Sequence, residues 1–441
     1  MNRELGRTRA AALIVIVGLL TANGWCQKIT KIDRERTQTM LREISSDIKK
    51  HYYDPKLHGV DWDAKVEEMR QKIDATDSMN FALSKVAAAL DSLNDSHTFF
   101  LPPVHNSRYD YGWQAQVIGD RCFVIRVRPG SDAEKKGVKR GDELVALNGF
   151  TPDRNNLWKM EYVFNTLRPQ PALRLDLRDP AGKQRQVEVV TALIERKRVM
   201  DLTGMGNGND MWDLIRQEES DQHLGRARFA EVNDVGILKF PEFDFTESEI
   251  EGMVGKARKH KALILDLRGN PGGSVETLKY LIGGCFEKEI KIGDRIGRSE
   301  QKPMVAKLHG HPFTGKLVVL VDSKSASAAE LFARVVQIEK RGTVLGDLSS
   351  GSVMEAKHYS YKAGIDTVVF YGASITDADI VMTDGKSLEH NGVVPDEIML
   401  PSAEDLANGR DPVLARAVEK VGGKLDPEAA GKLFPYEWAK F

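Results

Sequence analysis

The sequence is poor in cysteine. Three cysteines occur in 441 residues, at Cys26, Cys122 and Cys285. Cys26 belongs to an apolar N-terminal region, and the other two fall in segments of different character. This distribution argues against a disulfide framework and excludes a cysteine-based zinc site. We therefore expect Cys122 and Cys285 to be buried as small hydrophobic residues.

An excess of charge of one sign is also missing. The 63 lysines and arginines almost cancel the 64 aspartates and glutamates, so no broad basic surface exists to hold a phosphate backbone, and nucleic acid is not an expected partner. The HExxH and GxxxxGK[ST] motifs are absent, which argues against a zinc protease and a phosphate loop. We expect His309-Gly-His311 to lie in a loop, and no metal or cofactor is implied.

The N-terminal region has the three-part plan of a secretory signal peptide, predicted over residues 1–26. Its features are three arginines, an apolar run and two small residues: Arg3, Arg7 and Arg9, residues 10–20, and Ala22 and Gly24. The run is short for a stable membrane span, although an uncleaved anchor is the alternative. Bulky Trp25 disfavours a lipid acceptor at Cys26. Export to the periplasm or the medium is the expected localisation.

The remainder is too long for one compact core, which predicts two or three domains. Residues 28–105 show helical spacing of apolar side chains and are expected to form an N-terminal helical subdomain. Residues 109–192 read as short strands with turns, including Asp179–Gly182, and predict an inserted β-rich domain. Strands and helices alternate in residues 200–441, which predicts an α/β layer fold with a largely buried sheet.

Two loops of the α/β region carry candidate chemistry. An apolar strand over residues 317–321 leads through small residues to Ser327, and a helix is expected from Ala328. A serine there presents its hydroxyl where free N–H groups and the helix dipole favour negative charge, although helix capping is an equally good role. The strand at residues 262–267 precedes Gly272 and Gly273, whose backbones are candidates for an oxyanion hole.

Four motifs together resemble the C-terminal-processing and tricorn peptidase family, which includes the tail-specific proteases. They are Asn94–Thr98, Leu267–Gly273, Ser325–Glu330 and Leu388–Asp396. The resemblance covers essentially everything after the predicted signal peptide. It implies a ClpP/crotonase-like layered α/β core and a polypeptide substrate, and a homo-oligomer is compatible with it.

The inserted segment is similar to a second known module. Residues 130–149, with Gly130, Gly137, Gly141 and Asp142 in place, resemble the core of PDZ domains. In such domains a peptide adds as a strand to a sheet edge, and its carboxylate meets backbone N–H groups. The resemblance implies that Tyr111-Gly112-Trp113 forms the carboxylate-binding turn.

The family has two catalytic designs. One branch uses a lysine base where this sequence has Ser352, and a positioned base contributes roughly 10²- to 10⁴-fold. The tricorn-like branch implies Ser327 as nucleophile and His97 as base. It also implies that Ser96 orients the His97 ring and that Glu389 polarises the Ser96 hydroxyl. The oxyanion would bind the N–H groups of Ala328 and of Gly272 or Gly273. Lys357 is the alternative base.

We therefore predict a serine peptidase that acts on exported polypeptides through an acyl-enzyme on Ser327. The missing lysine keeps open a catalytically inactive, PDZ-containing peptide-binding protein. A binder of small hydrophobic ligands on the same fold is a third alternative. The position of the insert also suggests that it covers the cleft and moves when a peptide binds.

Overall fold

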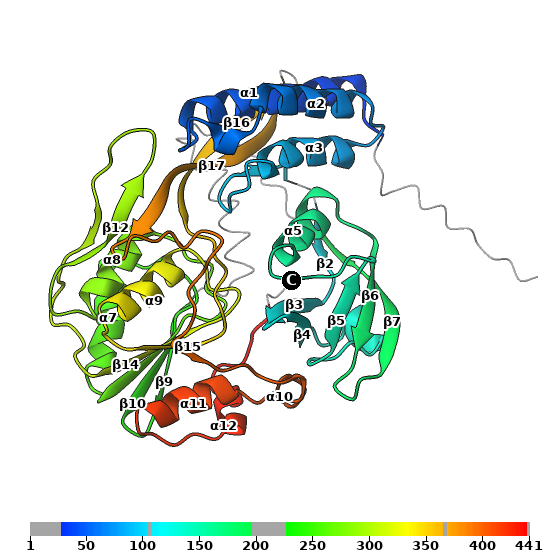
Figure 1. Cartoon of the computed structure of the whole chain (residues 1–441). Helices are drawn as coiled ribbons and strands as arrows, with labels where there is room; N and C mark the ends of the chain where they lie inside the picture. Colours follow the sequence, from blue (N-terminus) through cyan, green and yellow to red (C-terminus); the bar gives the residue numbers. More distant parts are fainter. Residues whose placement is uncertain (1–27, 105–106, 196–225, 365–367, 439–441) are drawn as a thin grey trace, which may run out of the picture.

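A computed structural model describes residues 28–104, 107–195, 226–364 and 368–438 (Figure 1). The predicted signal peptide lies outside these residues. Within the described ranges, every helix is too short or too polar to cross a membrane.

A six-stranded sheet forms the centre of the α/β core, which we define as residues 226–438. Its strand order is β18-β15-β14-β11-β10-β9, and all neighbours are parallel except β9 and β10. The strands are β9 Arg228–Val232, β10 Val235–Lys239, β11 Ala262–Asp266, β14 Lys316–Val321, β15 Thr343–Gly346 and β18 Glu397–Ile398. Every residue of β11 is buried, as expected for a sheet covered on both faces.

Helices cover both faces of this sheet. One layer consists of α7 Glu247–Ala257, α8 Val275–Gly283 and α9 Ala328–Ile338. The other face packs against α11 Pro412–Lys420 and α12 Pro427–Lys432, which α10 Ala403–Asn408 precedes. The arrangement confirms the predicted α/β layer fold. Cys285 is buried in this core and Cys122 in the insert, both as free thiols, as predicted.

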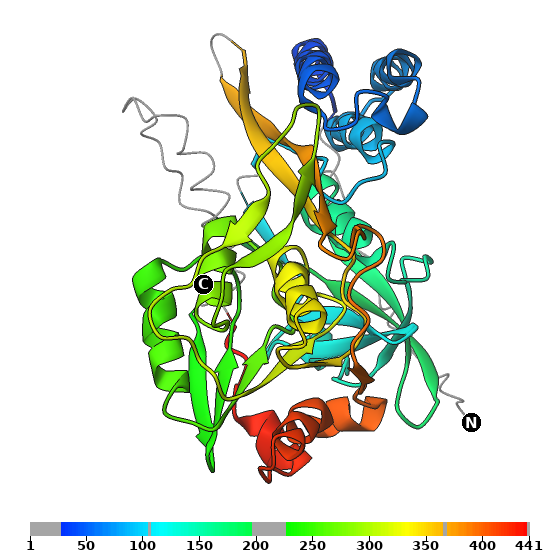
Figure 2. The ribbon, with the colours of Figure 1, turned by 60° about the vertical axis from the view of Figure 1, so that its left-hand side comes forward.

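A second sheet joins the core to the N-terminal helices. It contains β1 Phe99–Leu101, β12 Ile290–Ile296, β13 Met304–Ala306, β16 Met354–Ala363 and β17 Val369–Met382. Figure 2 shows the orange pair β16–β17 rising from the core toward the blue helices. These helices are α1 Lys31–His51, α2 Trp62–Asp74 and α3 Met79–Asp91, with the short 3₁₀ turn η1 Leu57–Gly59 between α1 and α2. Their apolar faces share one cluster with Phe100, Tyr371 and Ile375.

Strand β1 carries the segment that follows His97 into this sheet. Phe99 pairs with Ser374 of β17 in antiparallel register, and Leu101 pairs with Gly372. The intervening Phe100 is fully buried between the strands and the helices. The position of His97 is therefore set by both the helices and the long β17 strand.

Residues 107–195, which we call the insert, fold around a five-stranded sheet. Its order is β3-β4-β5-β6-β7, which leaves β3 at an edge. The strands are β3 Trp113–Ile118, β4 Arg121–Val127, β5 Glu143–Leu147, β6 Ala172–Arg178 and β7 Gln184–Val190; β2 Ser107–Asp110 pairs with β8 Ala192–Glu195. The helical elements are α4 Asp132–Lys135, α5 Leu157–Tyr162 and η2 Val163–Leu167. The predicted turn at Asp179–Gly182 closes the β6–β7 hairpin.

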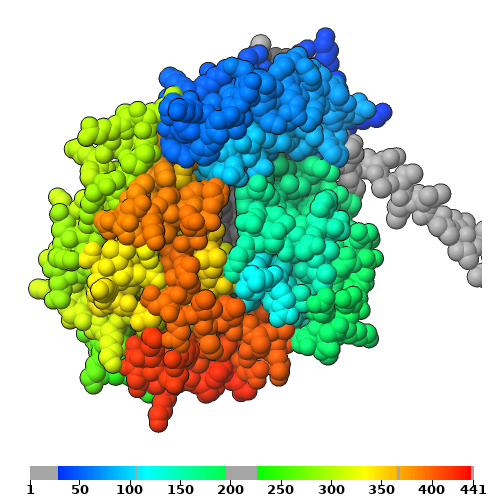
Figure 3. Space-filling model, in the orientation of Figure 1, coloured from blue at the N-terminus to red at the C-terminus, as the bar shows by residue number. Residues whose placement is uncertain are grey.

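The insert lies against the core, as Figure 3 shows from one side, and its contacts include α10 and the loops after β14 and β15. Gln116 Nε2 donates to Asp322 Oδ2 at 2.7 Å, in the loop that follows β14. Asp347, which follows β15, accepts from Gly119 N at 2.9 Å and from Arg154 at 2.7 Å. One of these two loops, the one after β14, leads to Ser327.

Replacing Phe100 by alanine tests the shared cluster. We expect Phe100→Ala to lower the free energy of unfolding by about 3–5 kcal/mol, because it leaves a cavity between β1 and the helices. Urea titration followed by tryptophan fluorescence measures the change. Val104→Ala is the control, since Val104 is half exposed. Equal effects of the two substitutions would contradict the packing described.

Candidate active site

Ser327 occupies a strained turn between β14 and α9. Its φ of 53° and ψ of −119° lie outside the regions that non-glycine residues usually adopt, and such a conformation costs about 1–3 kcal/mol. Two contacts hold it in place: the Ser327 N–H donates to Ser352 O at 2.8 Å and to the Glu330 carboxylate at 3.0 Å. Ser327 therefore sits at a helix N-terminus, where the sequence placed it.

The glycine loop after β11 packs directly on Ser327. A Cβ on Gly272 would lie 2.6 Å from the Ser327 Cβ, so only glycine permits this approach. The Gly272 N–H is occupied, because it donates to Asn270 Oδ1 at 2.8 Å. Among the described residues, the N–H groups of Gly273 and Ala328 have no hydrogen-bond acceptor. The pair available to an oxyanion is therefore Gly273 and Ala328, and Gly272 gives close packing.

Ser96, His97 and Glu389 form a hydrogen-bonded chain, although 293 positions separate Ser96 from Glu389. Ser96 Oγ donates to Glu389 Oε2 at 2.8 Å and lies 2.7 Å from His97 Nδ1. The Ser96 N–H also donates to Glu389 Oε1 at 2.8 Å. Since the one hydroxyl proton of Ser96 goes to the carboxylate, His97 Nδ1 must be the donor to Ser96. His97 Nε2 then carries the free lone pair of a base.

The segment Ser352–Val353 connects this chain to Ser327. Ser352 O accepts from the Ser327 N–H, and the next N–H, of Val353, donates to Glu389 Oε2 at 2.9 Å. Ser327 and His97 are both described, and no hydrogen bond joins their side chains. Such contacts are often long in ligand-free enzymes and tighten when substrate binds.

Burial controls the charge of the site. Burial lowers the pKa of His97 to about 4, with Asp95 opposing and His358 reinforcing the shift. Burial also raises the pKa of Glu389, against hydrogen bonds from Val353 and Ser96 that lower it. Asp95 Oδ1 accepts from the His97 and Thr98 N–H groups at 2.9 and 2.7 Å, which fixes the backbone of this turn. His97 is thus neutral at pH 7, as a general base requires.

Known proteins share this architecture. Residues 234–399 match the model of peptidase family S41, and residues 33–80 match the tricorn protease C1 domain. The α/β core thus contains a segment that matches peptidase family S41, and the N-terminal helices contain one that matches a tricorn protease domain. The fold of the chain is also that of a mature CPAF structure complexed with lactacystin, at a TM-score of 0.65 and 16% identity over 91% of this chain and 99% of that one. The photosystem II D1 C-terminal processing protease gives a TM-score of 0.52 at 17% identity, over 91% and 100%.

Curated relatives include a tricorn protease homolog and carboxyl-terminal-processing peptidases. It is 25% identical to the putative tricorn protease homolog 2 of Streptomyces coelicolor, over 84% of this chain and 31% of the relative. It is 24% identical to the chloroplastic carboxyl-terminal-processing peptidase 3 of Arabidopsis thaliana, over 71% and 60%. The chain thus spans less than two thirds of these two relatives. The C-terminal processing peptidase of Tetradesmus obliquus is 24% identical over 90% and 82%.

Glu330 is a functional candidate that the sequence reasoning missed. Its side chain is fully buried and accepts four hydrogen bonds, from Ser349 Oγ at 2.5 Å, Gly351 N at 2.8 Å, and Ser352 N and Ser327 N at 3.0 Å. Burial raises the pKa of Glu330 to about 7, although all four bonds lower it. The Ser327-x-x-Glu330 spacing predicts a local helix cap. It does not predict contact with residues 349–352.

Lys357 does not fit the role of alternative base. Its Nζ lies 2.5 Å from Asp377, and two thirds of its side chain is exposed. This hydrogen bond raises the pKa of Lys357, so the amine is protonated at neutral pH and cannot accept a proton. Ser352, in the place of the family's lysine, has its Oγ 2.9 Å from Ser350 Oγ.

The central N–H of the turn at Tyr111–Trp113, predicted to bind a peptide carboxylate, is engaged within the chain. The Gly112 N–H donates to Asp110 Oδ1 at 2.9 Å, and Asp110 is ion-paired with Arg128 at 2.8 Å, so the central donor of the turn is occupied. The Tyr111 hydroxyl bonds to Gln170. Trp113 begins β3 and lies beside this closed turn.

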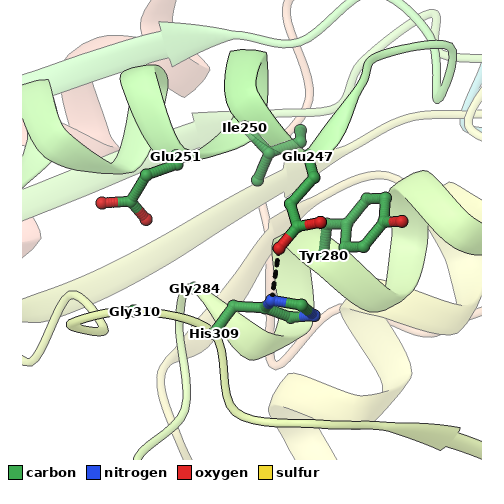
Figure 4. Close-up of a pocket in the computed structure, with 7 residues that line it drawn as sticks. All are labelled: Glu247, Ile250, Glu251, Tyr280, Gly284, His309 and Gly310. Carbon is green, nitrogen blue, oxygen red and sulfur yellow. Dashed lines mark ion pairs between the residues drawn. The ribbon is translucent and has the colours of Figure 1, made fainter.

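A cavity of about 270 Å³ lies elsewhere, between α7, α8 and the loop at residues 307–311 (Figure 4). His309 Nδ1 points at Glu247 and lies 2.9 Å from its Oε1. Tyr280 packs edge-on against the same imidazole. His309 is in a loop, as predicted, and none of the predicted catalytic residues lines this cavity.

Replacing Glu330 by glutamine tests its buried charge through stability. The folded-state pKa of Glu330, about 7, exceeds the ordinary 4.5. Between these two pH values Glu330 is therefore ionised in the unfolded state and protonated in the folded state, so the free energy of unfolding falls as the pH rises from 4.5 to 7. We expect Glu330→Gln to lack this loss. Its amide NH₂ would also face backbone donors, at about 1–3 kcal/mol.

Urea midpoints of both proteins between pH 4.5 and 7.5 measure this difference. The exposed Glu276, also in the first turn of a helix, supplies the matched control Glu276→Gln, which should follow the wild-type slope. Parallel curves for wild type and Glu330→Gln would show that Glu330 is not a raised, buried acid.

Proposed function

We propose that the chain is a serine peptidase that hydrolyses polypeptides through an acyl-enzyme on Ser327. The observation that carries the proposal is the hydrogen-bonded chain Glu389–Ser96–His97, which leaves Nε2 of a neutral imidazole as the proton acceptor. The match of residues 234–399 to peptidase family S41 and the relatives named as processing peptidases support the same activity.

The first half of the reaction forms the acyl-enzyme. His97 Nε2 takes the proton of Ser327 while Ser327 Oγ attacks the scissile carbonyl carbon. The negative charge that develops on the carbonyl oxygen is stabilised by the N–H groups of Gly273 and Ala328, each worth about 2.7–4 kcal/mol in comparable sites. The helix dipole of α9 adds to this stabilisation.

Ser96 and Glu389 stabilise the positive charge that His97 acquires. Ser96 keeps the Nδ1–H in place, and ionised Glu389 polarises the Ser96 hydroxyl, so the imidazolium is favoured without proton transfer to the carboxylate. The imidazolium then donates its proton to the leaving amine. Water, activated by the same Nε2, hydrolyses the ester and restores Ser327.

The insert is proposed to be a PDZ domain that receives extended peptides. Its strand β3 lies at the edge of the sheet and next to the loop that leads to Ser327. Strand addition there would bring a polypeptide close to the catalytic serine. The closed Gly112 turn favours internal peptide segments over a free carboxylate. The arginine-led apolar N-terminus supports export as the localisation.

The rival hypothesis is a peptide-binding protein without catalysis. Its basis is Ser352, which stands where one branch of the family has a lysine base. His97, already joined to Ser96 and Glu389, supplies a base that needs no lysine, and this contact favours the enzyme.

A fluorophosphonate probe tests the nucleophile. We expect wild-type protein to be labelled and Ser327→Ala to show no labelling, because the probe reacts with an activated hydroxyl. Intact-mass spectrometry and in-gel fluorescence measure the adduct. Ser350→Ala is the matched control, since this exposed serine lies in the neighbouring loop and should leave labelling unchanged. Labelling of Ser327→Ala at the wild-type rate would refute the assignment.

The pH dependence of labelling tests the base. Because burial lowers the pKa of His97 to about 4, neutral imidazole persists in acid, and the rate falls only as the pH drops through the lowered value. We expect the half-maximal second-order rate constant clearly below pH 6.5. Circular dichroism at each pH controls for unfolding. A limb at pH 6.5 or above would contradict the buried, neutral His97.

A further inference from the structure

Residues 434–438, with the sequence Phe-Pro-Tyr-Glu-Trp, leave the helical layer after α12 and lie on the insert. Figure 1 shows this red segment running from α12 to the β3–β4 hairpin. Beyond α12 the structure describes residues 433–438. The segment contacts both the insert and the core, and each set of contacts is specific.

Aromatic side chains of the segment meet a polar face of the insert. The Arg126 guanidinium carbon lies 3.8 Å from the centre of the Tyr436 ring. Gln114 joins the two: its Oε1 accepts from Arg126 at 2.8 Å, and its Nε2 donates to the Tyr436 hydroxyl at 3.1 Å. The Arg128 guanidinium carbon lies 4.5 Å from the centre of the Trp438 ring.

The two aromatic rings also contact one another, edge to face, with centroids 5.1 Å apart. Burial lowers the pKa of Arg126, with the nearby Tyr436 and Asp322 opposing the shift. A guanidinium that has lost water gains more from an aromatic face than an exposed one does. The surface formed by Gln114, Arg126 and Arg128 thus contacts two aromatic side chains that are separated by one intervening residue.

The same segment is fastened to the core through β9. Arg228 donates to Pro435 O at 2.6 Å, and its guanidinium carbon lies 5.5 Å from the centre of the Phe434 ring. Arg226 forms an ion pair with Glu437 at 3.3 Å. Residues 434–438 therefore bridge the insert and the core, two units that also meet at the loops after β14 and β15 and at α10.

We propose that Gln114, Arg126 and Arg128 form a binding surface for an aromatic-x-aromatic peptide segment, and that residues 434–438 of the same chain occupy it as a strap. Strand β3 carries Gln114 under the strap and Gln116 against Asp322, two residues apart. Side chains at this spacing share one face of a strand. The strap thus holds the edge of the insert against the loop that leads to Ser327.

Peptide binding to the full-length chain tests this surface without reference to catalysis. The probe is a fluorescein-labelled peptide of residues 434–441, followed by fluorescence anisotropy. In the Tyr436→Ala/Trp438→Ala protein the strap is released and the surface is free. We expect this protein to bind the peptide at least ten-fold more tightly than wild type, whose own segment competes. Adding Arg126→Met should weaken that binding at least ten-fold.

A peptide carrying both alanine substitutions should bind none of the proteins. Hydrogen–deuterium exchange of residues 434–438 should be at least ten-fold faster in full-length Arg126→Met than in wild type. Equal peptide binding by wild type and the released variant, no binding by the released variant, or unchanged exchange in Arg126→Met would each overturn the strap.

Discussion

Glu330 and Glu389 accept backbone N–H groups from three successive residues, Gly351, Ser352 and Val353. This short segment lies between the nucleophile on one side and the His97 chain on the other. Buried carboxylates are stable only when they are well hydrogen-bonded. The site therefore depends on one constraint: the N–H groups of residues 351–353 must bond to both carboxylates at once. This arrangement sets the relative positions of Ser327 and His97.

The rest of the fold brings the glycine loop, Ser327 and His97 close to residues 351–353. The parallel strands β11 and β14 end in the glycine loop and in the Ser327 turn, so both arise at one edge of the sheet, where α/β folds usually bind ligands. His97 comes from outside the core, and the pairing of β1 with β17 fixes its position at the site. The insert contacts the loop that precedes Ser327, through Gln116 and Asp322.

Much of this was predictable where chemistry follows local sequence. Three local patterns predict the structure that forms there: the apolar spacing around Leu41, the strand-to-helix turn at Ser327 and the Ser96-His97 motif. Side-chain partners at long range were not predictable. The capture of the Gly272 N–H by Asn270 and of the Gly112 N–H by Asp110 depends on rotamers, and the shared cluster of Phe100 with Tyr371 joins segments 271 positions apart.

A double-mutant cycle on Ser96→Ala and Glu389→Gln tests the central claim most directly. If Glu389 acts on His97 only through Ser96, either substitution alone should slow phosphonylation of Ser327 about as much as both together, as found for catalytic residues that act as a unit. Rate factors that simply multiply in the double variant would show that the two residues act independently, and the proposed proton-transfer chain would be wrong.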